Sequence, residues 1–340
     1  MTDGGLTDVH AHFTTDSYIA RAKAGGHRRA DGMPEALWPH WTVSRQLDLM
    51  AEAGITKAIL SISSPGVHFG DDTAARSLAR EVNDVAAEVV QQHPGRFGFF
   101  ASLPLPDIDG SLREIDYVFD ELRADGVILL TNSDGGYLGD PRWGPVLAEL
   151  DRRAAVVLLH PTSCAGHEDL ALGRPRPVVE FMFDTARTVV DLVVSGAAER
   201  YPHLRLIVPH AGGVLPLLAD RVDRFAFLDG ENGDRPSARS ALGRFYYDLA
   251  GDPTPGQLDA LATVTSPDRI LYGSDSAWTR DAQVLRTIGM LDASDAKDAR
   301  YGESWRRLTT RNAERLLSGP AASGEPDAPA PVGKDADSAT

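Results

Sequence analysis

Near its start the chain reads Thr7-Asp8-Val9-His10-Ala11-His12-Phe13, with two histidines separated by a single residue. We predict a strand over Leu6–His10. Because side chains alternate between the two faces of a strand, His10 and His12 project to the same side where the strand ends. Two converging imidazoles form half of a metal site, although they could equally be two solvated loop histidines. The choice depends on whether other strand ends supply further ligands.

Apolar runs alternate with longer stretches of helical spacing along most of the 340 residues. Repeated strand and helix units predict a parallel sheet with right-handed crossovers, and eight of them favour a closed (β/α)8 barrel of the TIM type. An open doubly wound sheet is disfavoured because no G-x-G-x-x-G follows the first strand. The runs predicted as strands are Leu6–His10, Lys57–Ile62, Phe97–Leu103, Val127–Thr131, Ala155–His160, Arg205–Pro209, Phe245–Ala250 and Arg269–Gly273. Predicted helices include Val43–Ala53, Ala74–Gln92, Leu112–Ala124, Pro145–Arg153 and Val178–Glu199.

Two segments fall outside this alternation. Thr14–His40 is a long polar stretch after the first strand, and we expect a loop that covers the mouth of the barrel. Residues 319–340 are rich in Ala, Pro, Gly, Ser and Asp, with Val332 as the single large apolar side chain, and we expect a disordered tail. The chain is therefore predicted to consist of a catalytic barrel domain, residues 1–318, and this tail.

Composition narrows the class of function. The formal net charge of −15 argues against nucleic acid as a partner, because phosphate binding needs a basic face. Cys164 is the one cysteine, which excludes an internal disulfide and fits a reducing compartment. The start of the chain lacks the pattern of a signal peptide, and no apolar run reaches membrane-spanning length. We therefore expect a soluble cytoplasmic protein without membrane contact.

Three more predicted strands end in residues that bind metals. The fifth strand ends in His160-Pro161, the sixth leads into His210, and the eighth leads into Asp275. Any one of these could be a structural residue, but carboxyl ends of barrel strands meet at one rim, where active sites form. The remaining histidines scatter over loops and helix ends and are interpreted as structural: His27, His40, His68, His93, His167 and His203.

The order of these elements resembles the signature of the amidohydrolase superfamily, and more narrowly its aminocarboxymuconate-semialdehyde decarboxylase-like branch. The elements are His10-Ala11-His12, His160-Pro161, His210-Ala211-Gly212-Gly213 and Gly273-Ser274-Asp275. Within that branch, stretches such as Phe183-Asp184-Thr185-Ala186-Arg187 look most like the 6-methylsalicylate decarboxylases. The resemblance extends from about Leu6 to Leu317.

The resemblance implies that one divalent metal is bound by His10, His12, His160 and Asp275, with His210 beside it as a general acid or base or a further ligand. Zinc is the first expectation on ligand type, and manganese the second, because related decarboxylases use it. The fourth predicted strand, Val127–Thr131, does not end in lysine, which favours a mononuclear centre.

The implied activity is metal-dependent, non-oxidative decarboxylation of a salicylate-type aromatic acid, which makes the chain a carbon–carbon lyase. Either Asp275 or His210 could take part in protonating the ring, and the sequence leaves both routes open. A metal-dependent hydrolase of a lactone or amide would use the same ligands, with His210 activating water. A barrel that only binds a ligand or a partner is the remaining alternative.

Three residues are candidates for substrate binding. Arg221 matches an arginine that contacts the substrate carboxylate in the family, in some members across a subunit boundary, or it is a surface arginine paired with Asp220 or Asp223. Trp278 and Phe183 are expected to pack on the ring, and either could be a plain structural aromatic. The family further implies a homodimer or homotetramer. Where a branch member that binds a dicarboxylate has arginine, this chain has Gln46, which favours an aromatic monoacid.

Overall fold

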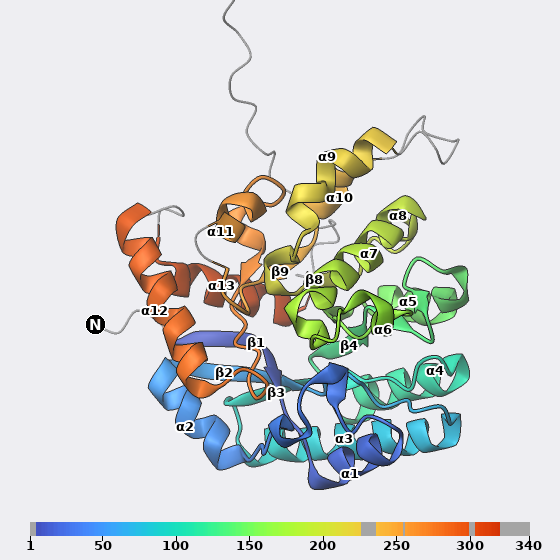
Figure 1. The fold of residues 1–340 in the computed structure, drawn as a ribbon. Helices are drawn as coiled ribbons and strands as arrows, with labels where there is room; N and C mark the ends of the chain where they lie inside the picture. Colours follow the sequence, from blue (N-terminus) through green and yellow to red (C-terminus); the bar gives the residue numbers. More distant parts are fainter. Residues whose placement is uncertain (1–4, 226–235, 254–255, 299–302, 320–340) are drawn as a thin grey trace, which may run out of the picture.

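Eight parallel strands form a barrel in a computed structural model of the chain, which describes residues 5–225, 236–253, 256–298 and 303–319 (Figure 1). The barrel closes between its last and first strands, where the backbone N–H of Val9 donates to the carbonyl oxygen of Tyr272 at 2.9 Å. The predicted (β/α)8 fold is thereby confirmed. In spatial order the strands are β1 (Leu6–His12), β2 (Ile55–Ser61), β3 (Phe97–Ser102), β4 (Gly126–Leu130), β7 (Val156–His160), β8 (Arg205–Val208), β9 (Tyr246–Asp248) and β10 (Ile270–Leu271).

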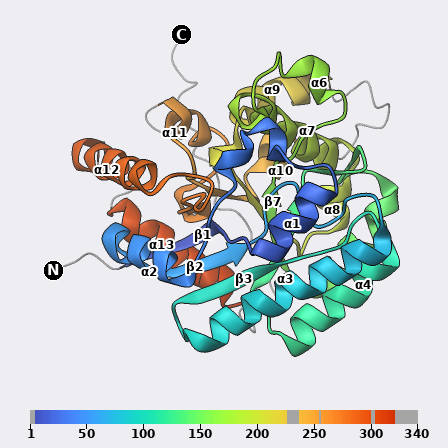
Figure 2. The ribbon, with the colours of Figure 1, turned by 60° about the horizontal axis from the view of Figure 1, so that its bottom comes forward.

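Helices surround the barrel and begin and end at residues suited to those positions (Figures 1 and 2). In α2, for example, the hydroxyl of Thr42 accepts from the backbone N–H of Arg45, and Gly54 ends the helix with φ 73°. The larger helices are α2 (Val43–Ala53), α3 (Asp72–Gln92), α4 (Ile108–Asp116), α5 (Gly144–Arg152), α7 (Glu180–Val194), α9 (Leu215–Phe225), α12 (Asp281–Asp298) and α13 (Trp305–Leu317). The remaining helices are α1 (Asp16–Ala24), α6 (His167–Leu170), α8 (Ala197–Arg200), α10 (Ala238–Leu242) and α11 (Gly256–Leu261).

A layer of apolar side chains fills the barrel interior below its mouth. Every strand contributes to it, and α13 adds Ala313 and Leu316 to the same cluster. Because alternate residues share a face, the strands that carry Leu158 and Tyr246 in this layer carry His160 and Asp248 two residues further on. The apolar layer therefore supports a polar layer at the carboxyl ends of the strands. The strand residues in the apolar layer are Val9, Ile59, Phe100, Ile128, Val156, Leu158, Ile207, Tyr246 and Leu271.

The structure departs from the predicted elements in four places. The stretch Thr14–His40 is not all loop, because Thr15 caps α1 and this helix buries Tyr18 and Ala22. The predicted helix Val178–Glu199 is interrupted at Gly196, whose φ of 72° separates α7 from α8. The predicted helix Leu112–Ala124 is α4 followed by a π-helical turn over Tyr117–Glu121. Sequence patterning also missed a short hairpin of β5 (Asn132–Ser133) and β6 (Gly136–Tyr137).

Two further predictions concern the tail at the end of the chain and membrane-spanning segments. The predicted tail lies outside the described residues apart from Gly319. Within the described ranges, none of the helices combines the length and the apolar character that crossing a bilayer requires.

Candidate metal centre

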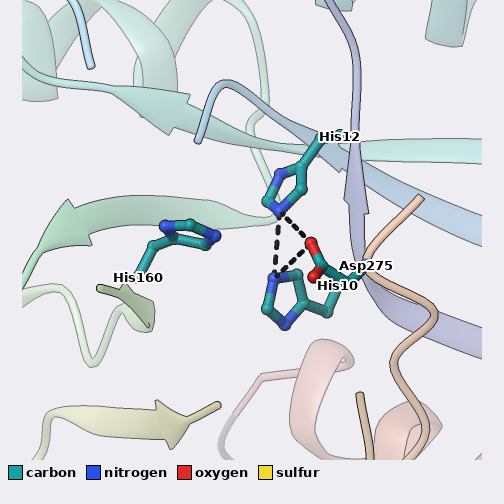
Figure 3. A group of neighbouring side chains, drawn as sticks. All are labelled: His10, His12, His160 and Asp275. Atoms are coloured by element: carbon teal, nitrogen blue, oxygen red, sulfur yellow. Dashed lines mark hydrogen bonds and ion pairs between the residues drawn. The ribbon is translucent and has the colours of Figure 1, made fainter. Parts of the chain in front are cut away.

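The four predicted ligands come together at the mouth of the barrel (Figure 3). One potential ligand atom from each of His10, His12, His160 and Asp275 lies within 4.8 Å of the other three. The Nε2 atoms of His10 and His12 are 3.0 Å apart, and Nε2 of His12 is 3.2 Å from Oδ1 of Asp275. Strands β1 and β7 and the segment after β10 therefore bring together residues that are up to 265 positions apart in the chain.

Each histidine of this cluster is held through its other ring nitrogen. Nδ1 of His10 lies 2.8 Å from the Asp248 carboxylate, Nδ1 of His12 lies 3.0 Å from the Ser61 hydroxyl, and Nδ1 of His160 lies 2.7 Å from a backbone carbonyl oxygen. Bonding at Nδ1 leaves Nε2 to face the common point, which is the arrangement of metal-binding histidines. The donor set therefore fits one divalent metal, and His10, His12, His160 and Asp275 form its site.

The charges around this site favour a cation. Burial lowers the pKa of His12 and lowers that of His160 more strongly, so both imidazoles are neutral. Burial also opposes a charge on His10, but the carboxylates of Asp248 and Asp275 outweigh it and raise the pKa of His10 to about 9. For Asp275, the neighbouring imidazoles of His12, His210 and His10 outweigh burial and hold the pKa well below its usual range. The buried carboxylate of Asp248 and the partly buried one of Asp275 thus attract positive charge to this point.

His210 stands beside the ligand cluster in an unusual backbone conformation. Its φ is 55°, and the next residue, Ala211, has φ 51°. Left-handed conformations at residues other than glycine cost roughly 1–3 kcal/mol each and persist where neighbours hold them. Here the backbone N–H of His210 donates to Oδ1 of Asp248 at 3.0 Å, and the carbonyl oxygen accepts from Gln257 at 2.6 Å. The turn directs Nε2 of His210 to 3.7 Å from Oδ2 of Asp275.

A cavity of about 310 Å³ lies over these residues. Its lining includes His160, His210 and Asp275, and Ser63 and Ser64 add hydroxyl groups. The described residues that line it include no Lys or Arg. Its apolar walls come from Met33, Pro177, Phe181, Met182 and Trp278.

The segment after α1 covers part of the cavity, as the sequence led us to expect. Ala30, Asp31 and Met33 line the cavity, and the Asp31 carboxylate accepts hydrogen bonds from the backbone and hydroxyl of Ser163. Figure 2 shows this dark blue segment crossing toward α6 and α7. The loop that carries Ser163 therefore holds the segment that covers the cavity, although the two are far apart in the chain.

The three candidate substrate residues lie in different surroundings. Trp278 lines the cavity, and its Nε1 donates to the Ser63 hydroxyl at 2.7 Å. Phe183 is 44% exposed, and Phe181 and Met182 line the cavity instead, because successive helix residues point about 100° apart. Arg221 is exposed on α9, outside this cavity, with its guanidinium 5.1 Å from the Phe225 ring centroid.

The two surface partners considered for Arg221 bond elsewhere. Asp220 pairs with Arg239 at 2.6 Å, and the Asp223 carboxylate accepts from the backbone N–H of Ala238. Among the described residues, Arg221 therefore pairs with neither Asp220 nor Asp223, and it does not line the cavity at the metal site of its own chain.

Sequence analysis did not single out Asp248, Ser61 or Gln257. Asp248 could have been noticed, since a carboxylate inside the apolar run Phe245–Ala250 becomes a buried charge that needs partners. Ser61 and Gln257 carry no such signal. Their contacts arise from the pairing of β1 with β2 and from the docking of α11 against the turn at His210.

This fold and site define an amidohydrolase: the amidohydrolase family matches residues 7–319, so the chain belongs to that family. The chain is 35% identical over 293 residues to 6-methylsalicylic acid decarboxylase from Penicillium expansum, which covers 84% of this chain and 89% of the relative. It is 36% identical over 300 residues to a decarboxylase from Penicillium terrestre, covering 84% and 88%. These relatives confirm the family resemblance found in the motifs. They also support the prediction that the chain is a metal-dependent carboxy-lyase.

Solved structures agree on the fold. A crystal structure of an amidohydrolase II protein superimposes with a TM-score of 0.85 at 32% identity, covering 92% of this chain and 100% of the other. A dihydroxybenzoic acid decarboxylase from Polaromonas sp. JS666, solved with bound manganese and 2-nitroresorcinol, has a TM-score of 0.78 at 23% identity, covering 93% and 97%. The second likeness shows a shared fold.

Proposed function

We propose that the chain catalyses non-oxidative decarboxylation of a salicylate-type acid, with 6-methylsalicylate as the model substrate. One observation carries the proposal: a cluster of three imidazoles and a carboxylate borders, through His160 and Asp275, a cavity of about 310 Å³ that apolar side chains such as Phe181 and Trp278 also line. A single substituted benzene ring suits this size and this combination of polar and apolar lining residues. The decarboxylase relatives support the same reaction.

In this reaction the bond between the ring and the carboxylate breaks and a C–H bond forms, without oxidation or reduction. When bound, a divalent metal supplies a Lewis acid that orients and neutralises the carboxylate and the ortho oxygen of the substrate. His210 is placed to hold or deliver a proton, because it lines the cavity and its Nε2 lies 3.7 Å from Asp275. Asp275 remains the alternative proton carrier in this proposal.

The walls of the cavity favour a monoacid. Trp278 and Phe181 offer apolar faces for a ring. Gln46 does not line the cavity; it is buried, accepts from Nε1 of Trp41 at 3.2 Å and bonds to the Ser276 hydroxyl at 3.3 Å, so this position holds a neutral amide and supplies no cation for a second carboxylate.

For the metal we propose zinc first, on the histidine-rich ligand set, and manganese second. The manganese bound by the structurally similar Polaromonas enzyme keeps the second choice open. We also propose that the protein is cytoplasmic, on its single cysteine and its sequence features.

The proposal is tested by supplying purified protein with zinc or manganese and 6-methylsalicylate. We expect carbon dioxide and 3-methylphenol to be released in equal amounts. Gas analysis measures the first and chromatography the second. Benzoate, which lacks the ortho oxygen, is the control and should not react. Turnover of an aromatic lactone or amide without any carbon dioxide release from the acids would instead identify a hydrolase.

We further propose a homodimer, or a homotetramer built from such dimers, in which Arg221 enters the cavity of the neighbouring subunit. Arg221 lies on α9 beside Phe225, and α9 contacts α7, which in turn contacts η5 (Arg176–Val178). These three elements carry exposed apolar side chains, here called the α7–α9 face: Val178, Phe183, Leu217 and Phe225. Leu217 is 75% exposed, and a second copy of the chain would bury it. The cavity lacks a cation of its own among its described lining residues, although its substrate is an anion.

Replacing Arg221 with methionine is expected to raise KM about 10- to 100-fold, since a charge-assisted hydrogen bond to the carboxylate is lost. Metal content should stay unchanged. Mixing this variant with His210→Ala protomers should restore roughly a quarter of wild-type activity, because mixed dimers contain one complete site. No recovery in verified mixed dimers would mean that Arg221 does not act across subunits.

A further inference from the structure

Asp248 is a buried carboxylate that contacts two parts of the site at once. It is fully buried at the end of β9. Its Oδ2 lies 2.8 Å from Nδ1 of the metal ligand His10. Its Oδ1 accepts the backbone N–H groups of His210 and Ala250, each at 3.0 Å. One side chain therefore links a ligand on β1 to the turn after β8.

The close approach of these groups depends on a glycine. Gly273, after β10, lies against both His10 and Asp248, and a Cβ at this position would lie 2.7 Å from Cβ of His10 and 3.2 Å from Cβ of Asp248. A larger residue would push the two side chains apart. The packing at this point thus leaves Asp248 and His10 in direct contact.

We propose that Asp248 is a positioning residue whose single carboxylate orients both the imidazole of His10 and the backbone of His210. A carboxylate can only accept hydrogen bonds, so Nδ1 of His10 carries the hydrogen and the lone pair of Nε2 faces the metal site. The other oxygen anchors the backbone of His210 at its left-handed conformation and so directs the imidazole into the cavity. The inference rests on the proposed function for the role of His210, and on the donor set alone for the role of His10.

Asparagine at this position cannot serve both groups. If its oxygen faces the two backbone N–H groups, its amide NH2 faces Nδ1 of His10 and favours the tautomer with hydrogen on Nε2, which cannot bind a metal. If the amide is turned around, its NH2 faces two N–H donors, and the turn at His210 loses its anchor. The first orientation keeps two hydrogen bonds against one, so the amide must turn around before zinc can bind. Zinc affinity therefore falls, and the zinc-loaded variant has lost the anchor of the turn at His210.

A matched control exists in Asp8 on β1. It is also fully buried, and its Oδ1 accepts the backbone N–H groups of His10 and Ser274 at 3.1 and 3.0 Å. An asparagine oxygen can still accept from both of these groups. Asp8→Asn therefore repeats the loss of a buried carboxylate without placing an amide against the His10 ring.

The test titrates zinc into the chelator-treated full-length variants against a competing fluorescent chelator, and then measures kcat at saturating zinc. For Asp248→Asn we expect zinc affinity about 10- to 100-fold weaker than wild type, and kcat still reduced about 10-fold or more at saturation, with KM changed less than kcat. Asp8→Asn should retain zinc affinity within about threefold. The affinity measurement needs no substrate, so it tests the inference even if the wild-type chain does not decarboxylate the acids tried.

Unchanged zinc affinity in Asp248→Asn would overturn the proposal, as would full kcat at saturating zinc, which would restrict Asp248 to His10. Equal losses in Asp8→Asn would overturn it too, since any buried carboxylate would then have the same effect. If Asp248→Asn does not fold, Asp248→Ser is measured in the same way, because its small side chain also removes the paired acceptor oxygens.

Discussion

His12→Ala protein is expected to lose its bound divalent metal and all measurable turnover. Nε2 of His12 is the ligand atom nearest to both His10 and Asp275, at 3.0 and 3.2 Å. Its removal leaves two imidazoles and one carboxylate for the metal. Second-sphere substitutions already weaken metal sites by about 10- to 100-fold, and the loss of a ligand should exceed that range. Metal content after dialysis, measured by mass spectrometry, checks the expectation.

The control for this variant is His203→Ala, which removes an exposed histidine outside the site. It should retain one metal per chain and full turnover. Thermal unfolding of both variants separates loss of metal from loss of the fold. One tightly bound metal per chain in His12→Ala would contradict the ligand assignment.

His210→Ala protein is expected to keep its metal and to lose about 100- to 10,000-fold in kcat, the usual range for removal of a general acid or base. His210 is absent from the four-residue ligand cluster, but it lines the cavity beside Asp275. Single-turnover kinetics with 6-methylsalicylate, together with metal analysis of the same sample, measure both quantities.

The backbone of this turn suggests a second variant. Because φ at His210 is 55°, an alanine there is strained, whereas asparagine adopts this conformation more readily. His210→Asn should therefore keep the turn and lose activity to the same degree as His210→Ala. Normal turnover in the two variants would exclude His210 as the acid or base and leave that task to Asp275.

Much of this site could be predicted from the sequence, because each of its residues can be recognised from the short strand that precedes it. His10, His12, His160 and Asp275 each follow an apolar run, and parallel barrel strands all end at the same rim, so residues at strand ends meet whatever their distance along the chain. The eight strands were predicted for the same reason, since their apolar runs are short and separated by helical periodicity.

Features that depend on how loops and helices dock could not be predicted in this way. Phe183 and Phe181 are two residues apart on one helix, and only the orientation of α7 against the barrel decides that Phe181 lines the cavity. The hydrogen bonds between Asp31 and Ser163 join segments that carry no matching pattern.

The sequence by itself indicated the parallel barrel and the strand ends that carry His10, His12, His160, His210 and Asp275, because hydrophobic periodicity and strand ends are properties of short segments; the family resemblance selected four of these residues as metal ligands. The tertiary structure decided which carboxylate holds His10, which segments cover the cavity and that Arg221 faces away from its own site. These depend on strand register and on side-chain packing between residues as far apart as His10 and Asp248, and no short stretch of sequence encodes such contacts.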